Sequence, residues 1–212
     1  MKDAYSSKKR NANNRDRKSI VMLSVEGKNQ TEKNYFNGLK LRNVRIVFAR
    51  GNDTDPINMA KALCRDYKSK SLTLELGDRA YCVIDGDLSK EKELQIAKAE
   101  ELIKGIKGQV IVSNPCVEVW FTCHFTDSTK QYKSSDEAVK RLQEFIPDYE
   151  KNVKGISDLL ADRTSHALEN AEKLNSYNQM AGRKKHHADY QPSTEIPVII
   201  EYLNGAEKRR EE

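Results

Sequence analysis

Short apolar runs that alternate with helical patterns are the feature that most constrains the fold of this chain. Four runs, each about the length of a buried strand, occupy residues 20–25, 44–49, 80–84 and 110–112. The segments between them have the apolar spacing of amphipathic helices: residues 31–41, 56–67 and 90–106. This alternation predicts an α/β fold in which right-handed crossovers build a parallel sheet of about four strands flanked by helices.

The pattern becomes helical after Pro115, which is expected to begin a helix that ends near residue 125. Residues 156–175 have the spacing of one long helix, and Ser193 is placed to cap a last helix that runs to residue 203. We therefore expect a basic tail over residues 1–18, an α/β domain over 19–125, and a helical extension over 126–212 that packs on it.

The net charge of the chain comes from its first residues. Lys and Arg number 37 and Asp and Glu number 32, a formal net charge of +5. Residues 1–18 hold 7 basic and 2 acidic side chains, so 7 − 2 = +5 accounts for the whole excess. Such a polar, basic segment is typical of a flexible tail, and its partner could be a polyanion such as nucleic acid. A purely solubilising terminus is the alternative.

Two further observations exclude classes of protein. No apolar stretch approaches the roughly 20 residues of a membrane helix, and no secretory signal follows the basic N-terminus. The four cysteines form no C-x-x-C pair, which disfavours a structural zinc site. We expect a reduced, cytoplasmic protein without a membrane partner.

Carboxylates follow two of the predicted strands. The first apolar run ends in Glu26-Gly27-Lys28, and the third ends in Asp85-Gly86-Asp87. Ligands of open parallel sheets bind beyond the carboxyl ends of the strands. If these two strands are neighbours, Glu26, Asp85 and Asp87 converge, and their repulsion favours a hard cation, Mg²⁺ or Mn²⁺. The alternative is that acidic residues simply favour strand ends and helix starts.

A fourth carboxylate lies one helical turn beyond the fourth strand. Four residues separate Asn114 from Glu118, so a helix that starts at Pro115 would direct both side chains toward the strand tips. We expect Glu118 to bind the metal or to support it, and Asn114 to orient a ligand. The favourable interaction of Glu118 with the helix dipole is the competing explanation.

Two classes of phosphate-binding protein have motifs that bear comparison with these. The segment after the first strand lacks the G-x-x-x-x-G-K frame of a P-loop. Asp85-Gly86-Asp87-Leu88-Ser89 resembles the nucleophile motif of haloacid-dehalogenase-type phosphatases, although that motif normally follows the first strand of its domain. A phosphatase of this kind is therefore an alternative function.

The order of the motifs resembles the Toprim arrangement, and among Toprim proteins it resembles the RloB family, which is linked to abortive phage infection. The matching segments are Ser24 to Phe36, Gly51 to Pro56, Val83 to Asp87, and Ser113 to Trp120. That family commonly has Asp-Arg-Asp where this chain has Asp85-Gly86-Asp87, and this change puts substrate choice more in doubt than metal binding.

The resemblance implies a Toprim-like, Rossmann-like fold and a metal-dependent nuclease that acts on DNA or RNA, often beside an SMC/ABC-type ATPase. It implies that Asp85 and Asp87 hold magnesium and that Glu26 shares the metal or acts as general acid or base. Further residues are expected to contact phosphate or to support the site: Lys28, Lys151, Thr31 and Glu32. Thr31 could equally cap the helix that follows it. A nucleotide-sensing Toprim subunit without catalysis is a further alternative.

Overall fold

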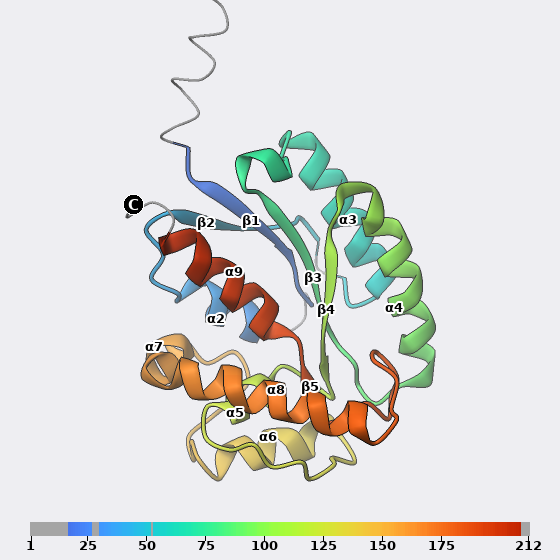
Figure 1. Cartoon of the computed structure of the whole chain (residues 1–212), viewed down its shortest axis with the longest axis vertical. Coiled ribbons are helices and arrows are strands. Elements are labelled where there is room, and N and C mark those ends of the chain that lie inside the picture. The colour runs from blue at the N-terminus through green and yellow to red at the C-terminus, as the bar shows by residue number, and fades with distance from the viewer. Residues whose placement is uncertain (1–16, 27–29, 52, 209–212) are drawn as a thin grey trace, which may run out of the picture.

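The computed structural model describes residues 17–26, 30–51 and 53–208, and its centre is a five-stranded mixed sheet (Figure 1). The strands are β1 (Ser19–Ser24), β2 (Val44–Phe48), β3 (Arg79–Asp85), β4 (Gln109–Asn114) and β5 (Ser193–Thr194). Their order is β2-β1-β3-β4-β5; the first four strands are parallel, and β5 is antiparallel to β4. The predicted α/β fold with four parallel strands is confirmed, and the short fifth strand is an addition.

Helices connect and cover these strands. They are α2 (Thr31–Asn37), α3 (Pro56–Ser69), α4 (Lys90–Ile103), α5 (Glu118–Cys123), α6 (Ser135–Gln143), α7 (Ile156–Leu160), α8 (Thr164–Met180) and α9 (Ile196–Lys208). Single 3₁₀ turns occur at Leu74–Leu76, Lys104–Ile106 and Ala161–Arg163. The last of these turns divides the long helix predicted over 156–175 into α7 and α8.

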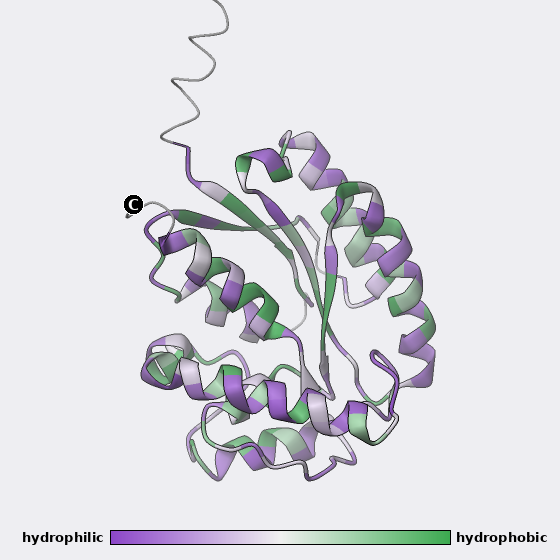
Figure 2. Ribbon diagram, viewed as in Figure 1, coloured by the Kyte–Doolittle hydropathy of each residue, from purple (hydrophilic) through white to green (hydrophobic). Residues whose placement is uncertain are grey.

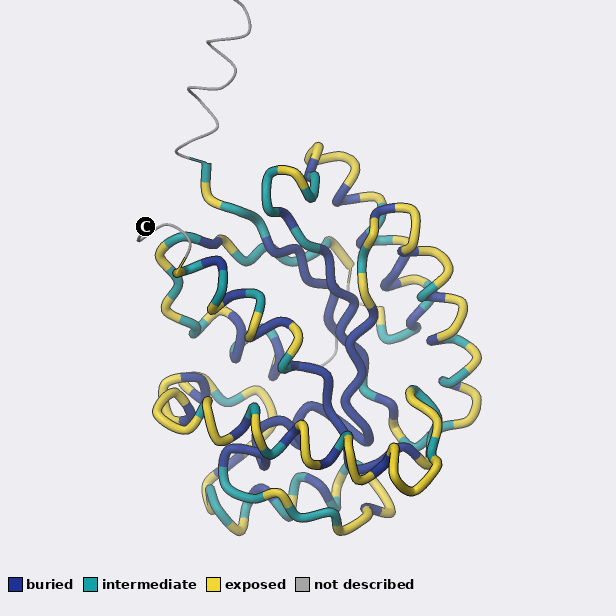
Figure 3. Tube along the Cα trace, viewed as in Figure 1, coloured by how far each residue is buried: buried dark blue, intermediate teal, exposed yellow. Residues whose placement is uncertain are grey.

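Alternating side chains of the central strands build a separate core on each face of the sheet. On β3, Cys82 packs with Met59 and Ile96 beneath α3 and α4, whereas Val83 packs on the opposite face with Trp120 and other side chains of the larger core. The central strands are accordingly apolar in Figure 2 and buried in Figure 3. Burial on both faces explains why the strands appear in the sequence as continuous apolar runs.

Side-chain caps fix where two of these helices begin. Pro56 occupies the first turn of α3, and the side chain of Asp55 accepts a hydrogen bond of 2.9 Å from the backbone N–H of Asn58. Ser89 accepts a bond of 3.3 Å from the N–H of Lys92 at the start of α4. Such caps satisfy backbone donors that have no partner within the helix. The Ser89 cap matters for the site because it places Lys92 in the first turn of α4.

Two expectations for the C-terminal half are wrong. Ser193 does not cap the last helix, because Ser193 and Thr194 are extended and pair with Asn114 and Ser113 of β4. Pro115 does not begin a helix, because α5 starts only at Glu118. Residues 115–117 therefore form a short connection between β4 and α5.

Arg17 holds the entry to β1 in place. Its guanidinium forms two hydrogen bonds, of 3.0 and 3.1 Å, with the buried carboxylate of Asp78. Asp78 also accepts the backbone N–H groups of Ile20 and Thr73. Residues 1–16, which make up most of the predicted basic tail, lie outside the described residues.

Candidate active site at the carboxyl ends of β1 and β3

The two strands whose tips carry the predicted carboxylates are neighbours. β1 pairs with β3, and Ser24 is in register with Cys82. Glu26 follows β1 by two residues, and Asp85 is the last residue of β3. The carboxyl ends of the parallel strands face helices α5, α6 and α8 in Figure 1. Both side chains therefore lie at one end of the sheet, as the sequence predicted for adjacent strands.

A lysine that sequence reasoning missed joins two of the predicted site residues. The ammonium Nζ of Lys92 lies 2.7 Å from Oε1 of Glu26 and 2.6 Å from Oδ2 of Asp87. Burial lowers the pKa of Lys92, but the charges and hydrogen bonds of Glu26 and Asp87 more than offset this, so the pKa is raised. Lys92 is therefore a cation bound to both carboxylates. The sequence feature that could have identified Lys92 is its place in the first turn of a helix, where the helix dipole disfavours a positive charge.

Asp85 lies among further negative charges. Its Oδ1 accepts the backbone N–H of Val117 at 2.9 Å. Burial raises the pKa of Asp85 well above its usual value, and nearby carboxylates act in the same direction. In decreasing order of effect these are Glu32, Glu26, Glu118 and Asp87. The pKa of Asp85 is thus raised first by burial and then by the four carboxylates around it.

Two of these neighbouring carboxylates are almost fully buried. Glu32, on α2, is 2% exposed, and its Oε2 has no hydrogen-bond partner among the described residues. Burial raises the pKa of Glu32 to about 8, with smaller contributions from Glu26 and Glu118. Glu118, on α5, is 1% exposed and accepts the hydroxyl of Tyr149 at 2.8 Å. Both lie close enough to Asp85 for their charges to raise its pKa.

Lys151 is held near this group by its neighbour Asn152. The N–H of Asn152 donates to Oγ1 of Thr31 at 3.0 Å, and its carbonyl accepts the side-chain amide of Asn34 at 2.7 Å. Thr31 therefore binds the segment that carries Lys151 and does not cap α2, whose N-cap is Gln30. Burial lowers the pKa of Lys151, but the charges of Glu118 and other groups raise it overall.

The turn that carries Asp87 has an uncommon backbone. Asp87 and Leu88 have φ values of 51° and 54°, in the left-handed region that few non-glycine residues occupy. The N–H of Asp87 donates to the carbonyl of Pro115 at 2.9 Å, and the N–H of Leu88 donates to Oδ1 of Asn114 at 3.2 Å. Backbone of this kind persists where its surroundings hold it, and it is frequent at functional sites.

Asn114 supports this turn, and its side-chain hydrogen bonds to described residues all go to backbone groups. Its amide Nδ2 is directed at three backbone carbonyls, those of His187, Ala188 and Tyr190, at 3.2, 3.1 and 3.2 Å. A Cβ atom at Gly86 would lie 2.7 Å from Oδ1 of Asn114, so only glycine fits there without a shift. Asn114 therefore links the Asp87 turn to the loop over residues 181–192.

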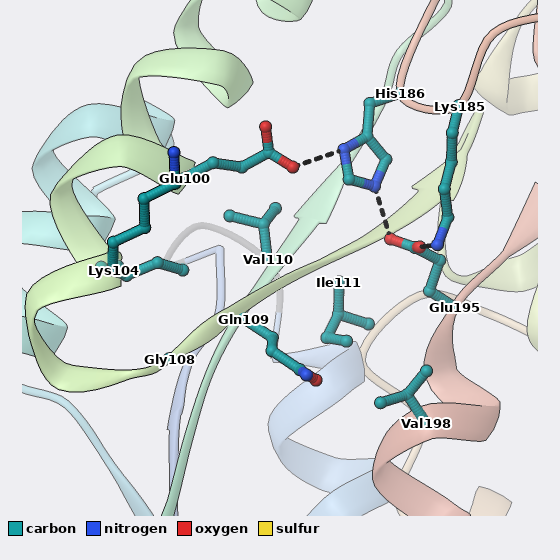
Figure 4. Close-up of a pocket in the computed structure, with 11 residues that line it drawn as sticks. Glu100, Lys104, Gly108, Gln109, Val110, Ile111, Lys185, His186, Glu195 and Val198 are labelled. Carbon is teal, nitrogen blue, oxygen red and sulfur yellow. Dashed lines mark hydrogen bonds and ion pairs between the residues drawn. The ribbon is translucent and has the colours of Figure 1, made fainter.

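An ion-pair network fastens the same loop to β4 and α4 (Figure 4). His186 Nε2 lies 2.7 Å from Oε2 of Glu195, and its Nδ1 lies 2.9 Å from Oε1 of Glu100. Lys185 also forms an ion pair with Glu195. Oε2 of Glu195 accepts the N–H of Val112 at 2.9 Å, so this side chain continues the pairing of β4 just beyond the two-residue strand β5.

This network is expected to make stability depend on pH. Burial lowers the pKa of His186, but Glu195 and Glu100 raise it overall, with Lys185 opposing them. A raised pKa in the folded state means that the stabilisation is complete below the ordinary His pKa of about 6.5 and is lost as pH rises through the folded value. Replacing His186 with Asn should cost about 2 kcal/mol at pH 6 and much less at pH 9.

Urea unfolding of both proteins at several pH values measures this difference. Burial raises the pKa of Glu195, but its cationic neighbours lower it overall. The contribution of Glu195 to stability should therefore be complete above its ordinary pKa of about 4.5 and be lost as the pH falls through the lower value of the folded state. His166, an exposed residue of α8, is the matched control, and His166→Asn should show no such pH dependence. An effect of His186→Asn that is equal at pH 6 and pH 9 would contradict the charged network.

Three facts bear on whether this group of residues could hold a metal ion. Lys28, one of the predicted phosphate contacts, lies outside the described residues. Within residues 17–26, 30–51 and 53–208, no three His, Cys, Asp or Glu side chains are arranged to hold a metal ion together. The Lys92 ammonium lies between Glu26 and Asp87. It therefore occupies the position that a cation shared by those two carboxylates would take.

The donors nevertheless match a hard cation in their chemistry. All of them are carboxylate oxygens, which Mg²⁺ prefers, and after burial it is their charges that raise the pKa of Asp85. One buried oxygen, Oε2 of Glu32, has no partner in the described part of the chain. The residues therefore fit a divalent cation by type and charge, provided that Lys92 yields its position.

Comparisons with known proteins agree with the motifs. Among the described residues, no helix is long and apolar enough to cross a membrane. Neither the search of curated proteins nor the search of solved structures gave a match. The family model described as RloB-like protein matches residues 21–203, which include Glu26, Asp85, Asp87 and Glu118. The match covers most of the chain and confirms the resemblance in the sequence; the chain belongs to the RloB-like family.

Proposed function

We propose that this protein is a Toprim-type, divalent-metal-dependent nuclease that hydrolyses phosphodiester bonds of DNA or RNA. The observation that carries the proposal is the group of carboxylates at the carboxyl ends of β1 and β3, where burial first, and then the neighbouring carboxylates, raise the pKa of Asp85. Four parallel strands of an α/β sheet present this group where ligands of such sheets bind. The nucleic-acid substrate, a role in phage defence and an ATPase partner rest on the family resemblance.

The carboxylates have separate parts in this proposal. Asp85 and Asp87 would hold the metal, Glu26 would share it, and Glu118 and Glu32 would support it from their buried positions. A bound divalent cation would activate water and relieve negative charge on the leaving oxygen. Burial raises the pKa of Glu26 even though Lys92 lowers it, which is the direction expected of a carboxyl group that acts as a general acid or base.

The cations of the site have a different part. Lys151 is exposed and sits beside Glu118 and Asp85, so it could contact a phosphate that approaches the carboxylates. Its position depends on Asn152, whose left-handed backbone (φ 70°) allows the reciprocal contacts with α2. This arrangement gives the site one cation that is fixed at Glu26 and Asp87 and another at its rim.

The test is incubation of the purified chain with plasmid, single-stranded DNA and transfer RNA in Mg²⁺, Mn²⁺ or EDTA. Cleavage that EDTA abolishes is the expected result. Release of phosphate from small phosphoesters without chain cleavage would instead indicate a phosphatase. No activity on any substrate, together with binding to an ATPase, would indicate a regulatory subunit.

Glu118→Gln is expected to lower cleavage by about ten- to a hundredfold and to raise the metal concentration needed for half-maximal rate. The amide oxygen of Gln can still accept the Tyr149 hydroxyl, so the midpoint of thermal unfolding should change little. Tyr149→Phe is the matched control, because it removes the hydrogen bond but keeps the carboxylate. Equal metal requirements for Glu118→Gln and the wild-type protein would remove Glu118 from the proposed site.

A further inference from the structure

Lys92 joins two members of the carboxylate group, Glu26 and Asp87, as an internal cation. Its side chain is only 11% exposed, and its ammonium contacts Glu26 at 2.7 Å and Asp87 at 2.6 Å. An isolated lysine on a helix usually extends into solvent, because its ammonium is strongly hydrated. The burial of this one, from the first turn of α4, indicates that the two carboxylates hold it there.

The rest of the group has no comparable partner. No salt bridge between described residues reaches Asp85, Glu32 or Glu118. Oε2 of Glu32 is buried and lacks any hydrogen bond within the described part of the chain. The one buried ammonium is therefore paired with two of the five carboxylates, and Lys151, the cation that acts on the other three, lies at the exposed rim.

A divalent ion bound through Oε1 of Glu26 and Oδ2 of Asp87 could not coexist with the ammonium in its present position. Mg²⁺ binds carboxylate oxygens at about 2.1 Å, and the Lys92 ammonium lies in hydrogen-bond contact with one oxygen of each residue. Two cations in that space would also repel each other. The four-carbon stem of lysine has the rotational freedom to move its ammonium out of the site.

We propose that Lys92 is an internal counter-cation that a divalent metal ion must displace from Glu26 and Asp87. The proposal rests on the metal site of the proposed function and adds its regulation: the lysine holds the carboxylates in place without metal and competes with metal for them. Lys92 is thus a positioning residue. Removing its charge should strengthen metal binding, which is opposite to the effect expected from a merely structural residue.

The experiment is titration of the purified full chain with Mn²⁺ alone, followed by electron paramagnetic resonance of the unbound ion. Lys92→Met should bind Mn²⁺ at least about tenfold more tightly than the wild-type protein. Lys92→Arg keeps the positive charge and should bind no more tightly than wild type. Lys90→Met is the matched control, because Lys90 lies in the same first turn but is exposed, and it should leave the affinity unchanged.

Thermal unfolding supplies a second readout. In EDTA, Lys92→Met should unfold at a lower temperature than the wild-type protein, because Glu26 and Asp87 then repel without compensation. Mn²⁺ should raise its midpoint by more than it raises that of the wild type, since tighter binding to the folded state stabilises it more. If Lys92→Met does not fold, Lys92→Gln takes its place in both measurements.

Two outcomes separate this inference from the function on which it rests. If Asp85→Asn abolishes Mn²⁺ binding but folded Lys92→Met binds no more tightly than wild type, the metal site stands and displacement of Lys92 is rejected. If neither the wild-type protein nor Lys92→Met binds Mn²⁺, the proposed metal-dependent function and the role of Lys92 both fail.

Discussion

Replacing Asp85 with Asn is expected to reduce nucleic-acid cleavage by more than a hundredfold. Loss of residues that merely orient a metal ligand commonly costs about ten- to a hundredfold in affinity or activity, so loss of a proposed ligand should cost more. Glu26→Gln and Asp87→Asn should have effects of the same order. The measurement is the initial rate of cleavage of the best substrate at saturating Mg²⁺, compared with the exposed control Asp162→Asn.

Stability distinguishes this loss from misfolding. An Asn at position 85 keeps an oxygen that can accept the Val117 N–H, and it removes a negative charge from among four other carboxylates. The midpoint of unfolding in EDTA should therefore stay the same or rise. If all three variants cleave at the wild-type rate, the carboxylate group is not the site of reaction. If Asp85→Asn is inactive and unfolds at a much lower temperature, the test says nothing of catalysis and the remaining two variants decide.

The positions of Glu26 and Asp85 could be predicted because they follow from the strands. Each apolar run indicates where a strand ends, and right-handed crossovers restrict the order in which parallel strands are joined. The carboxylates at their tips then come to one edge of the sheet without any knowledge of side-chain conformation. The same reasoning could not place Lys92, because a charged residue on a helix usually indicates a solvated face, and its partners lie 66 and 5 residues away in sequence.

The strand β5 was missed for a different reason. Two residues are too few to show an alternating pattern, and Ser193 has the side chain of a helix cap. Its extended conformation depends on contacts from elsewhere in the chain: pairing with β4 and the hydrogen bond from Val112 N–H to Glu195. Asn152 was missed similarly, because its role depends on a left-handed backbone and on contacts with α2, which is distant in sequence.

Asn114 was predicted at the site, but its role differs from the one expected. The sequence suggested that it orients a ligand or contacts a metal-bound water. In the structure its amide is directed at carbonyls of the 181–192 loop, and its oxygen accepts the N–H of Leu88. Its influence on the carboxylates therefore passes through the backbone of the turn that presents Asp87. This indirect role leads to an expectation about stability as well as activity.

Asn114→Ala is expected to lower the free energy of unfolding by about 3 kcal/mol and to reduce cleavage. The residue is 3% exposed, and its removal leaves the N–H of Leu88 and the carbonyl of Ala188 without a hydrogen bond among the described residues, each at a cost of about 1–3 kcal/mol before relaxation. The carbonyls of His187 and Tyr190 keep the hydrogen bonds from Tyr190 N–H and Ser193 Oγ. Urea unfolding measures the first effect. Hydrogen exchange should be faster in residues 181–192, because the loop loses its link to the turn at Leu88.

Asn114→Asp is the sharper variant, because it changes one function of the side chain and keeps the other. Its carboxylate can still accept the Leu88 N–H, but it places an acceptor against the three carbonyls that the amide of Asn114 faces. The loss of stability should therefore be at least as large as for Asn114→Ala, despite the closer match in shape. Asn170→Ala, which removes one hydrogen bond to the carbonyl of Cys123, should cost only about 1 kcal/mol. Wild-type stability of Asn114→Asp would show that the link between the loop and the turn does not depend on this amide.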